Sequence, residues 1–342
     1  MSSESNSFGP KGGFDKGGHF IRPPMQFRGQ ISSEKGSKFR PEPGRYHLYV
    51  SYACPWAHRT LIVRKLKGLE DLISFSVVHY RWPMDTGWRF PTVQEAVPEE
   101  NFVPDPLHKD VTRLAELYEK SSPGYDGRWT VPVLWDKKAD QIVNNESSEI
   151  IRILNTAFDE FLDPRYRGPA LDLYPEPLHS RINEHNDWHY HNINNGVYKS
   201  GLAKSQVAYE KALNDLFTHL DHVELHLAFH DGPYYFGEQL TETDVRLYVT
   251  IVRFDPVYVQ HFKCNMKDIR SGYPAIHKWL RYLYWNHDAF NTTTNFNHIK
   301  RHYFESHAMI NPSSIVPVGP IPCILPLDEE VAAASHRTST SY

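Results

Sequence analysis

Residues 46–67 read YHLYVSYACPWAHRTLIVRKLK, and this stretch decides the fold. Its first part, residues 46–51, is rich in aromatic and branched side chains and predicts a strand. Its second part, residues 55–67, repeats apolar residues at helical spacing and predicts an amphipathic helix. Cys54 lies between the two. A second strand is predicted over residues 73–79, so this region opens with a strand, a cysteine, a helix and a strand.

The position of Cys54 predicts a reactive thiol. Pro55 takes the first helical position, where its missing N–H costs nothing. A thiol there faces unpaired backbone N–H groups and the positive end of the helix dipole, which predicts a lowered pKa. His58 and Arg59 follow, in directions that the sequence leaves open. Ala57 stands where a dithiol site has its second cysteine, so a disulfide within this motif is excluded. A buried, inert cysteine is the alternative.

The segments that follow extend this opening into an α/β unit. A helix is predicted over residues 109–120, two short strands over 131–135 and 141–143, and a helix from Glu146. We expect one α/β domain over residues 45–156. Residues 80–108 hold little periodicity and many Pro, Trp and Glu residues, which is typical of a functional insertion.

The remaining segments differ in composition. Residues 1–44 are predicted to form an irregular leader, 157–178 a linker, 179–305 an all-helical domain, and 306–342 a C-terminal extension with a polar tail. Thr241 and Asp244 have the spacing of a capping box, in which an N-cap hydroxyl is followed three residues later by an acid.

Two further motifs suit the binding of a peptide with an amino-acid head group. Pro132 precedes a strand, and a cis bond to Val131 would present the Val131 backbone to an extended peptide. Glu146 and Ser147 stand at a helix start, where Ser147 can hold a carboxylate and Glu146 can pair with an ammonium. An ordinary edge proline and plain N-capping are the respective alternatives.

Composition disfavours several classes of function. The 342 residues carry a formal net charge of −4 without a basic run, which disfavours a nucleic-acid partner. The three cysteines are sparse and widely spaced, so we expect free thiols in a reducing compartment. We find neither a secretory signal nor an apolar run of roughly 20 residues, and expect a cytoplasmic protein without a membrane partner. His185 and His189 have helical metal-ligand spacing but no supporting motif, so no metal is expected.

The thiol, the backbone clamp and the head-group site follow one another in the order of a thioredoxin-like domain. The sequence therefore resembles the glutathione transferase superfamily, in which an N-terminal thioredoxin-like domain precedes an all-helical domain. Longer segments resemble its Xi class, the glutathionyl-hydroquinone reductases. These segments are residues 52–60, 130–136, 192–199, 253–258 and 261–265.

This resemblance implies a reaction and a set of site residues. S-glutathionyl-hydroquinones would be reduced to hydroquinones through a mixed disulfide between Cys54 and glutathione, with release of oxidised glutathione. Glutathione would be the cosubstrate, and the protein a homodimer. Tyr198 and Tyr284 would face the hydroquinone, and Tyr258 or Tyr282 could replace Tyr284. The residues implied in glutathione binding are Trp88, Arg128, Val131, Glu146 and Ser147.

Two alternatives remain at this point. One is an omega-like thioltransferase or dehydroascorbate reductase, which would use the same thiol. The other is a non-catalytic glutathione-binding module that has kept the fold.

Overall fold

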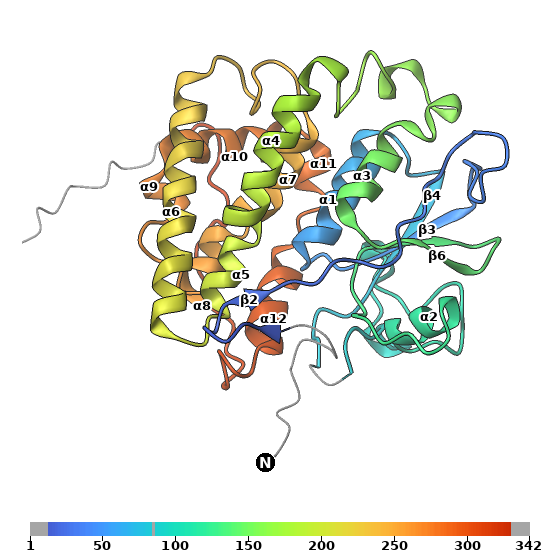
Figure 1. Cartoon of the computed structure of the whole chain (residues 1–342), viewed down its shortest axis with the longest axis horizontal. Helices are drawn as coiled ribbons and strands as arrows, with labels where there is room; N and C mark the ends of the chain where they lie inside the picture. The colour runs from blue at the N-terminus through green and yellow to red at the C-terminus, as the bar shows by residue number, and fades with distance from the viewer. Residues whose placement is uncertain (1–12, 84–85, 330–342) are drawn as a thin grey trace, which may run out of the picture.

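The computed structural model describes residues 13–83 and 86–329, and they form two packed halves. One half is a sheet with helices on both faces, and the other is entirely helical (Figure 1). The predicted fold class, a thioredoxin-like domain followed by a helical domain, is confirmed.

The sheet of the first half is mixed, with strand order β4-β3-β5-β6. Its strands are β3 (Tyr46–Val50), β4 (Ile73–Val77), β5 (Val133–Asp136) and β6 (Gln141–Asn144). β3 pairs in parallel with β4 and antiparallel with β5, which itself pairs antiparallel with β6. Parallel neighbours need a crossover connection, and the helix that begins after Cys54 supplies it.

The crossover helix α1 (Pro55–Leu66) is buried on nearly all sides. It packs on α3 (Ser147–Thr156) in its own half and on α7 (Glu242–Ile251) and α11 (Asp288–Asn291) of the helical half. The predicted one-sided amphipathic helix is therefore wrong, because α1 lies between the sheet and the helical half. A helix in that place is buried all round.

Several element boundaries differ from the predicted ones, and two of the differences have a local cause. Helix α2 (Leu114–Ser121) begins five residues later than predicted, because the Glu116 carboxylate accepts hydrogen bonds from the N–H groups of Thr112 and Arg113 and caps the helix there. Strand β5 begins two residues after Val131, because Pro132 has no N–H to offer the sheet.

The helical half is built around a long helix, α6 (Gln206–Phe229). No helix in the described ranges is long and apolar enough to cross a membrane. Two π-helical segments, Tyr190–Asn194 and Phe254–Tyr258, interrupt the helices nearest the α/β half. The other helices are α4 (His179–His189), α5 (Gly196–Gly201), α7 (Glu242–Ile251), α8 (Val259–His261), α9 (Ile269–Gly272), α10 (Pro274–Asn286), α11 (Asp288–Asn291) and α12 (Phe296–Ser306).

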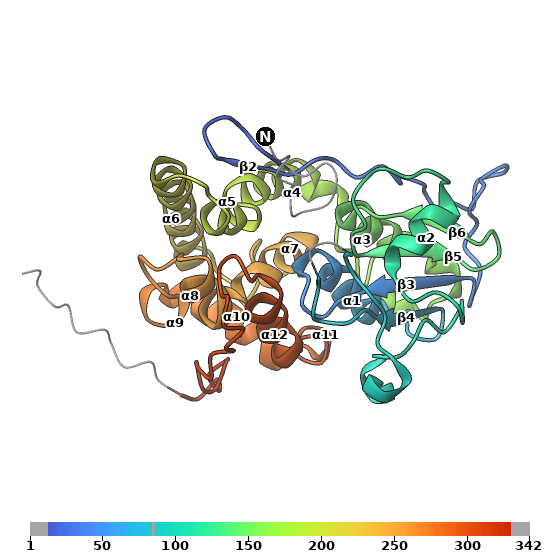
Figure 2. The same ribbon diagram turned by 90° about the horizontal axis from the view of Figure 1, so that it is seen from below.

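The leader, expected to be irregular, contains the short strands β1 (Gly13–Phe14) and β2 (Phe20–Ile21), which pair with each other. Residues 1–12 of the leader lie outside the described residues. From β2 the leader runs along the surface from the helical half to the sheet, as Figures 1 and 2 both show. It is tied at both ends: the Lys204 N–H donates to Gly18 O at 3.1 Å, and the Asn145 N–H donates to Phe27 O at 3.1 Å.

The insertion at residues 80–108 reaches the helical half. The Trp82 N–H donates to Ser306 Oγ at 2.9 Å, and His302 Nδ1 bonds to Tyr80 O at 2.7 Å. The ring of Trp88 stacks on His302 with centroids 5.0 Å apart. The insertion thus connects the α/β half to α12.

The predicted capping box is present at the start of α7. The buried Asp244 carboxylate accepts from the Thr241 N–H at 3.0 Å and from Thr241 Oγ1 at 3.2 Å. It also accepts from the Tyr235 N–H at 2.7 Å and from Trp279 Nε1 at 3.0 Å. Asp244 therefore holds α7, α10 and a loop together.

We predict that Thr241→Ala lowers the free energy of unfolding by about 1 kcal/mol, the usual cost of an N-cap. Asp244→Ala should cost more, about 2–4 kcal/mol, because it leaves buried donors of Tyr235 and Trp279 unpaired. Urea unfolding of both variants measures the two values, with Glu210→Ala on the exposed face of α6 as the control. Equal losses for the two variants would contradict the role given to Asp244.

Candidate active site

Cys54 lies at the end of the loop that follows β3, directly before the first turn of α1. The residue is partly exposed. Its Sγ donates to Val131 O at 3.6 Å, and the N–H groups of Trp56 and Ala57 point at the sulfur. The expected contact between the thiol and unpaired N–H groups of the helix start is therefore present.

The protonation of Cys54 differs from the prediction. Burial raises the pKa of the thiol, while the N–H groups of Trp56 and Ala57 and the charges of Arg253 and Arg22 act in the opposite direction. Burial prevails because the surrounding protein removes water that would solvate a thiolate. The prediction of a lowered pKa is wrong, since helix position was weighed without desolvation.

Arg253 fixes the loop that carries Cys54. Its Nη2 donates to Tyr52 O at 2.8 Å and its Nε to Ala53 O at 3.0 Å. Its Nη1 bonds to His58 Nδ1 at 3.1 Å. Burial, and then the charge of Arg253, hold the pKa of His58 well below its usual range, so His58 adds no positive charge to the site.

The head-group motif lies at the start of α3. The Glu146 carboxylate caps the helix by accepting from the Ser148 N–H at 3.0 Å and from Ser148 Oγ at 2.9 Å. Ser147 is the first helical residue, so its own N–H has no partner within the helix. Ser147 Oγ accepts from Arg59 Nη1 at 3.4 Å, and Arg59 lies over the Trp56 ring, next to Cys54.

Val131 and Arg128 lie on another side of Cys54. The Val131-Pro132 peptide is cis, the form that the sequence left open. Arg128 is close enough to the thiol for Cys54 to affect its pKa, which burial lowers to about 10. Arg128 Nε and Nη1 are buried and have no hydrogen-bond partner within the described ranges. An unpartnered buried guanidinium is a place for an anion.

Trp88 is nearly buried, with 7% of its surface exposed. Its ring stacks between those of Trp82 and His302. The preceding Gly87 has φ +69° and lies against Trp129, where a Cβ would come within 3.3 Å of the ring. Trp88 thus lies where the insertion meets α12, and the preceding Gly87 lies against Trp129, the residue after Arg128.

Tyr198 belongs to a chain of three phenols. Its hydroxyl lies 2.6 Å from that of Tyr303, which lies 3.0 Å from that of Tyr258. Burial raises the pKa of all three, so they stay protonated at neutral pH. Cys54 raises the pKa of Tyr198 further. The Arg22 guanidinium lies over the rings of both Tyr198 and Trp56, and Trp56 is two residues from Cys54.

The structure does not bring Tyr284 into this group. Its ring packs on Trp285 and Phe296, with centroids 4.8 and 6.3 Å apart, on the side of α10 that faces the C-terminal extension. Trp285 Nε1 donates to Leu325 O there. The prediction that Tyr284 lies beside Tyr198 is therefore wrong. The tyrosine beside Tyr198 is Tyr303 on α12. Tyr282 also lies elsewhere, against Tyr234.

Sequence reasoning missed Arg22, Arg253 and Tyr303 as members of this site. Each comes from another segment of the chain than Cys54. Arg253 begins the segment 253–258, which resembles the Xi class, but that resemblance gave it no role of its own. Tyr258, named as a replacement for Tyr284, bonds to Tyr303 and therefore belongs to the phenol chain.

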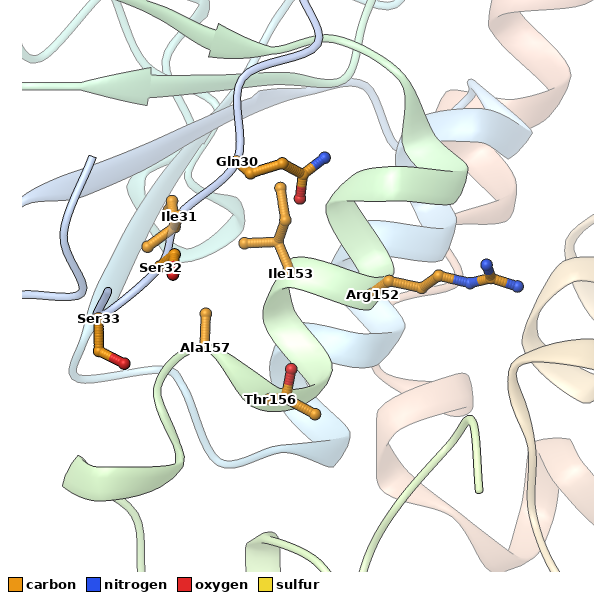
Figure 3. A pocket seen from close by; sticks show the side chains of 8 residues that line it. All are labelled: Gln30, Ile31, Ser32, Ser33, Arg152, Ile153, Thr156 and Ala157. Atoms are coloured by element: carbon orange, nitrogen blue, oxygen red, sulfur yellow. The ribbon is translucent and has the colours of Figure 1, made fainter. Parts of the chain in front are cut away.

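A separate cavity of about 310 Å³ lies between the leader and the outer face of α3 (Figure 3). Its lining contains none of the residues described above, so it is not the thiol site. The lining residues are Gln30, Ile31, Ser32, Ser33, Arg152, Ile153, Thr156 and Ala157. No group of three His, Cys, Asp or Glu residues that suits a metal occurs in the described part of the chain.

Comparisons with known proteins agree with this geometry. Residues 53–157 match the glutathione S-transferase N-terminal domain and residues 206–281 the C-terminal domain. A Schizosaccharomyces pombe relative named glutathione S-transferase omega-like 2 is 54% identical over 90% of this chain and 95% of its own length. The glutathionyl-hydroquinone reductase YqjG of Escherichia coli is 47% identical over 89% of this chain and 90% of its own.

Solved structures give the same result. The glutathione-bound structure of YqjG superposes with a TM-score of 0.79 at 45% identity and covers 90% of this chain and 95% of that one. The glutathione S-transferase Xi of Phanerochaete chrysosporium superposes with a TM-score of 0.88 at 55% identity and covers 95% of this chain and all of that one. The chain therefore belongs to the glutathione transferase family and, within it, to the Xi class.

Proposed function

We propose that the protein reduces S-glutathionyl-hydroquinones to hydroquinones with glutathione as the cosubstrate. The observation that carries this proposal is the position of Cys54 between a peptide-binding side, marked by Val131, and the phenol chain of Tyr198. One side suits a thiol tripeptide and the other an aromatic ring that needs a proton. The name and the glutathione-bound structure of the E. coli relative support the proposal.

Glutathione presents two carboxylates, one ammonium and a short peptide, and the site offers a partner for each. The N–H of Ser147 at the start of α3 suits the carboxylate of the head group. The Glu146 carboxylate suits its ammonium. The unpartnered donors of Arg128 suit the second carboxylate. The Val131 backbone suits the peptide in the middle, and Trp88 forms the wall beside Arg128.

The chemistry follows from these contacts. Tyr198 protonates the ring carbon that bears the sulfur, and the ring takes its keto form as a hydroxyl loses its proton. The Cys54 thiolate then attacks the glutathione sulfur, the carbon–sulfur electrons return to the ring, and the hydroquinone leaves. A second glutathione attacks the mixed disulfide and releases oxidised glutathione. With Ala57 in place of a second cysteine, this external thiol is required.

A raised pKa in Cys54 is compatible with this cycle. The thiol donates to Val131 O, and this contact stabilises its protonated form. A bound peptide that pairs with Val131 competes for the same oxygen. Glutathione binding would therefore remove one interaction that favours the neutral thiol.

The alternative function, an omega-like thioltransferase, needs only Cys54 and glutathione. The name of the S. pombe relative favours this alternative. It leaves the phenol chain without a chemical role. The other alternative, a non-catalytic glutathione-binding module, gives the partly exposed Cys54 thiol no chemical role. The homodimer and the cytoplasmic location stay predictions.

We predict that the apparent pKa of Cys54 in the absence of glutathione lies above the unperturbed value of about 8.5. Below its pKa the thiol is protonated and unreactive, so the alkylation rate should still rise above pH 8.5. Adding the analogue γ-glutamyl-alanyl-glycine should move the midpoint to lower pH, because the peptide takes Val131 O.

Iodoacetamide kinetics in a Cys323→Ser background measure this midpoint, since Cys323 is partly exposed and Cys264 is buried. An alkylation rate that levels off below pH 8 without the analogue would contradict this prediction. It would show that the helix start lowers the pKa of Cys54 by more than burial raises it.

We predict that Cys54→Ala abolishes the reductase activity while glutathione still binds. The proposed contacts of Val131, Glu146 and Ser147 lie on other segments and do not need the thiol. Calorimetry with glutathione tests this separation. Loss of binding together with activity would mean that the division of roles is wrong.

We predict that Tyr198→Phe lowers turnover of glutathionyl-hydroquinones by roughly tenfold or more, because the ring contact stays and the proton donor is lost. Tyr303→Phe should act in the same direction by removing the hydrogen bond to Tyr198. Tyr284→Phe should leave the rate close to that of the wild type, because Tyr284 packs against Trp285 and Phe296. Steady-state kinetics with each variant give the comparison.

Exchange with a small mixed disulfide serves as the internal reference, because a thiolate leaves without that proton. If Tyr198→Phe slows both reactions equally, Tyr198 shapes the site but does not donate. If Tyr284→Phe, and not Tyr198→Phe, lowers turnover of glutathionyl-hydroquinones, the assignment of Tyr198 as the proton donor is wrong.

A further inference from the structure

Arg22 is a leader residue that lies beside the candidate active site. Its guanidinium carbon lies 4.9 Å from the centre of the Trp56 ring and 5.1 Å from that of Tyr198. Trp56 is two residues from Cys54, and Tyr198 begins the phenol chain. Arg22 is half-buried and close enough to act electrostatically on both Cys54 and Tyr198.

The guanidinium of Arg22 is held in place but not neutralised. Its Nε donates to Asn195 Oδ1 at 3.0 Å. Its two terminal nitrogens have no hydrogen-bond partner, and it forms no ion pair with a carboxylate, among the residues that the structure describes. Arg28, six residues further along the leader, differs in this respect, because it forms a two-point ion pair with Glu149.

Both ends of the segment that carries Arg22 are fixed. On the helical side, the Lys204 N–H donates to Gly18 O at 3.1 Å and Ser205 Oγ donates to Gly17 O at 3.0 Å. On the sheet side, Met25 Sδ accepts from Thr130 Oγ1 at 3.4 Å, next to Val131. Arg22 is thus a placed cation rather than a free surface side chain.

The reaction creates an anion that suits such a cation. When the Cys54 thiolate attacks the glutathione sulfur of the keto form, the carbon–sulfur electrons enter the ring. The carbonyl oxygen beside that carbon takes the negative charge, and the hydroquinone leaves as an aryloxide. Sulfur is oxidised to the mixed disulfide and the ring carbon is reduced from C–S to C–H, so no other reductant is needed. Charge appears on one oxygen, where a fixed donor is most effective.

We propose that Arg22 binds the aryloxide oxygen of the departing hydroquinone, and thereby selects substrates with a hydroxyl beside the carbon–sulfur bond. This role rests on the proposed function. Its location supports it: Arg22 contacts the Tyr198 ring, the residue that would meet the aromatic ring. The proposed partners of the glutathione carboxylates are Arg128 and Ser147, and Arg22 lies close enough to Arg128 for its charge to lower the Arg128 pKa.

The test compares Arg22→Gln, which removes the charge, and Arg22→Lys, which keeps it without the planar fork. Arg28→Gln is the matched control from the same segment. For each protein, kcat/KM is measured for glutathionyl-hydroquinone and for a glutathione mixed disulfide of 2-mercaptoethanol. Arg22 also lowers the pKa of Cys54. That effect enters both reactions and cancels in the ratio of the two rates. Arg22 also lowers the pKa of Tyr198, which acts only on the hydroquinone substrate, so the leaving group is varied as well.

We expect the ratio to fall roughly tenfold or more in Arg22→Gln, less in Arg22→Lys, and not in Arg28→Gln. The loss should shrink for chlorinated hydroquinones, because chlorine stabilises the aryloxide without help from the protein. A purely structural role of Arg22 would not produce this dependence on the leaving group.

Three outcomes would overturn the proposal. If Arg22→Gln lowers kcat/KM equally for both substrates, Arg22 has only a structural role. A tenfold weaker affinity for glutathione in calorimetry, with an unchanged ratio, would move Arg22 to the glutathione site. Wild-type protein that exchanges the disulfide but leaves glutathionyl-hydroquinones intact would overturn the proposed function itself and, with it, this role.

Discussion

The buried guanidinium of Arg253 holds the site together. It comes from the helical half and donates to the carbonyls of Tyr52 and Ala53, the two residues before Cys54. It also donates to Val249 O at 2.7 Å within its own half. Without it, three buried carbonyls would lose a charged donor, and each loss costs about 1–3 kcal/mol. The position of the thiol therefore depends on the packing of the two halves.

The same packing decides the electrostatics of the site. Burial of α1 between the sheet and the helical half raises the pKa of Cys54 and lowers that of His58. Arg22 and Arg128 remain as cations without a carboxylate partner among the described residues. Positive charge near the thiol is complementary to the two carboxylates of glutathione and to the aryloxide that the proposed reaction would form.

Three segments outside the motif around Cys54 contribute to the candidate site: the leader, the insertion, for which a functional role was predicted, and α12. The leader supplies Arg22, the insertion supplies Trp88, and α12 supplies Tyr303 and His302. The insertion and α12 contact one another through the Trp88 and His302 rings. A change in the length of any of these segments would alter the surroundings of the thiol without touching the motif around Cys54.

The sequence by itself determined the local units. Strand β3, helix α1 starting at Pro55, the helix start at Ser147 and the capping box at Thr241 all follow from backbone geometry and short-range periodicity, which neighbouring residues specify. The order of these units was enough to identify the fold class and the family.

Only the tertiary structure decided which distant groups meet Cys54. Whether Tyr284 or Tyr303 lies near the thiol depends on the packing of α10, which carries Tyr282 and Tyr284, and of α12, which carries Tyr303. Whether the thiol pKa rises or falls depends on desolvation by segments up to about two hundred residues away, such as that of Arg253. Long-range burial and pairing are not encoded in any local pattern, so the sequence could predict a cysteine at the helix start but not its complete environment.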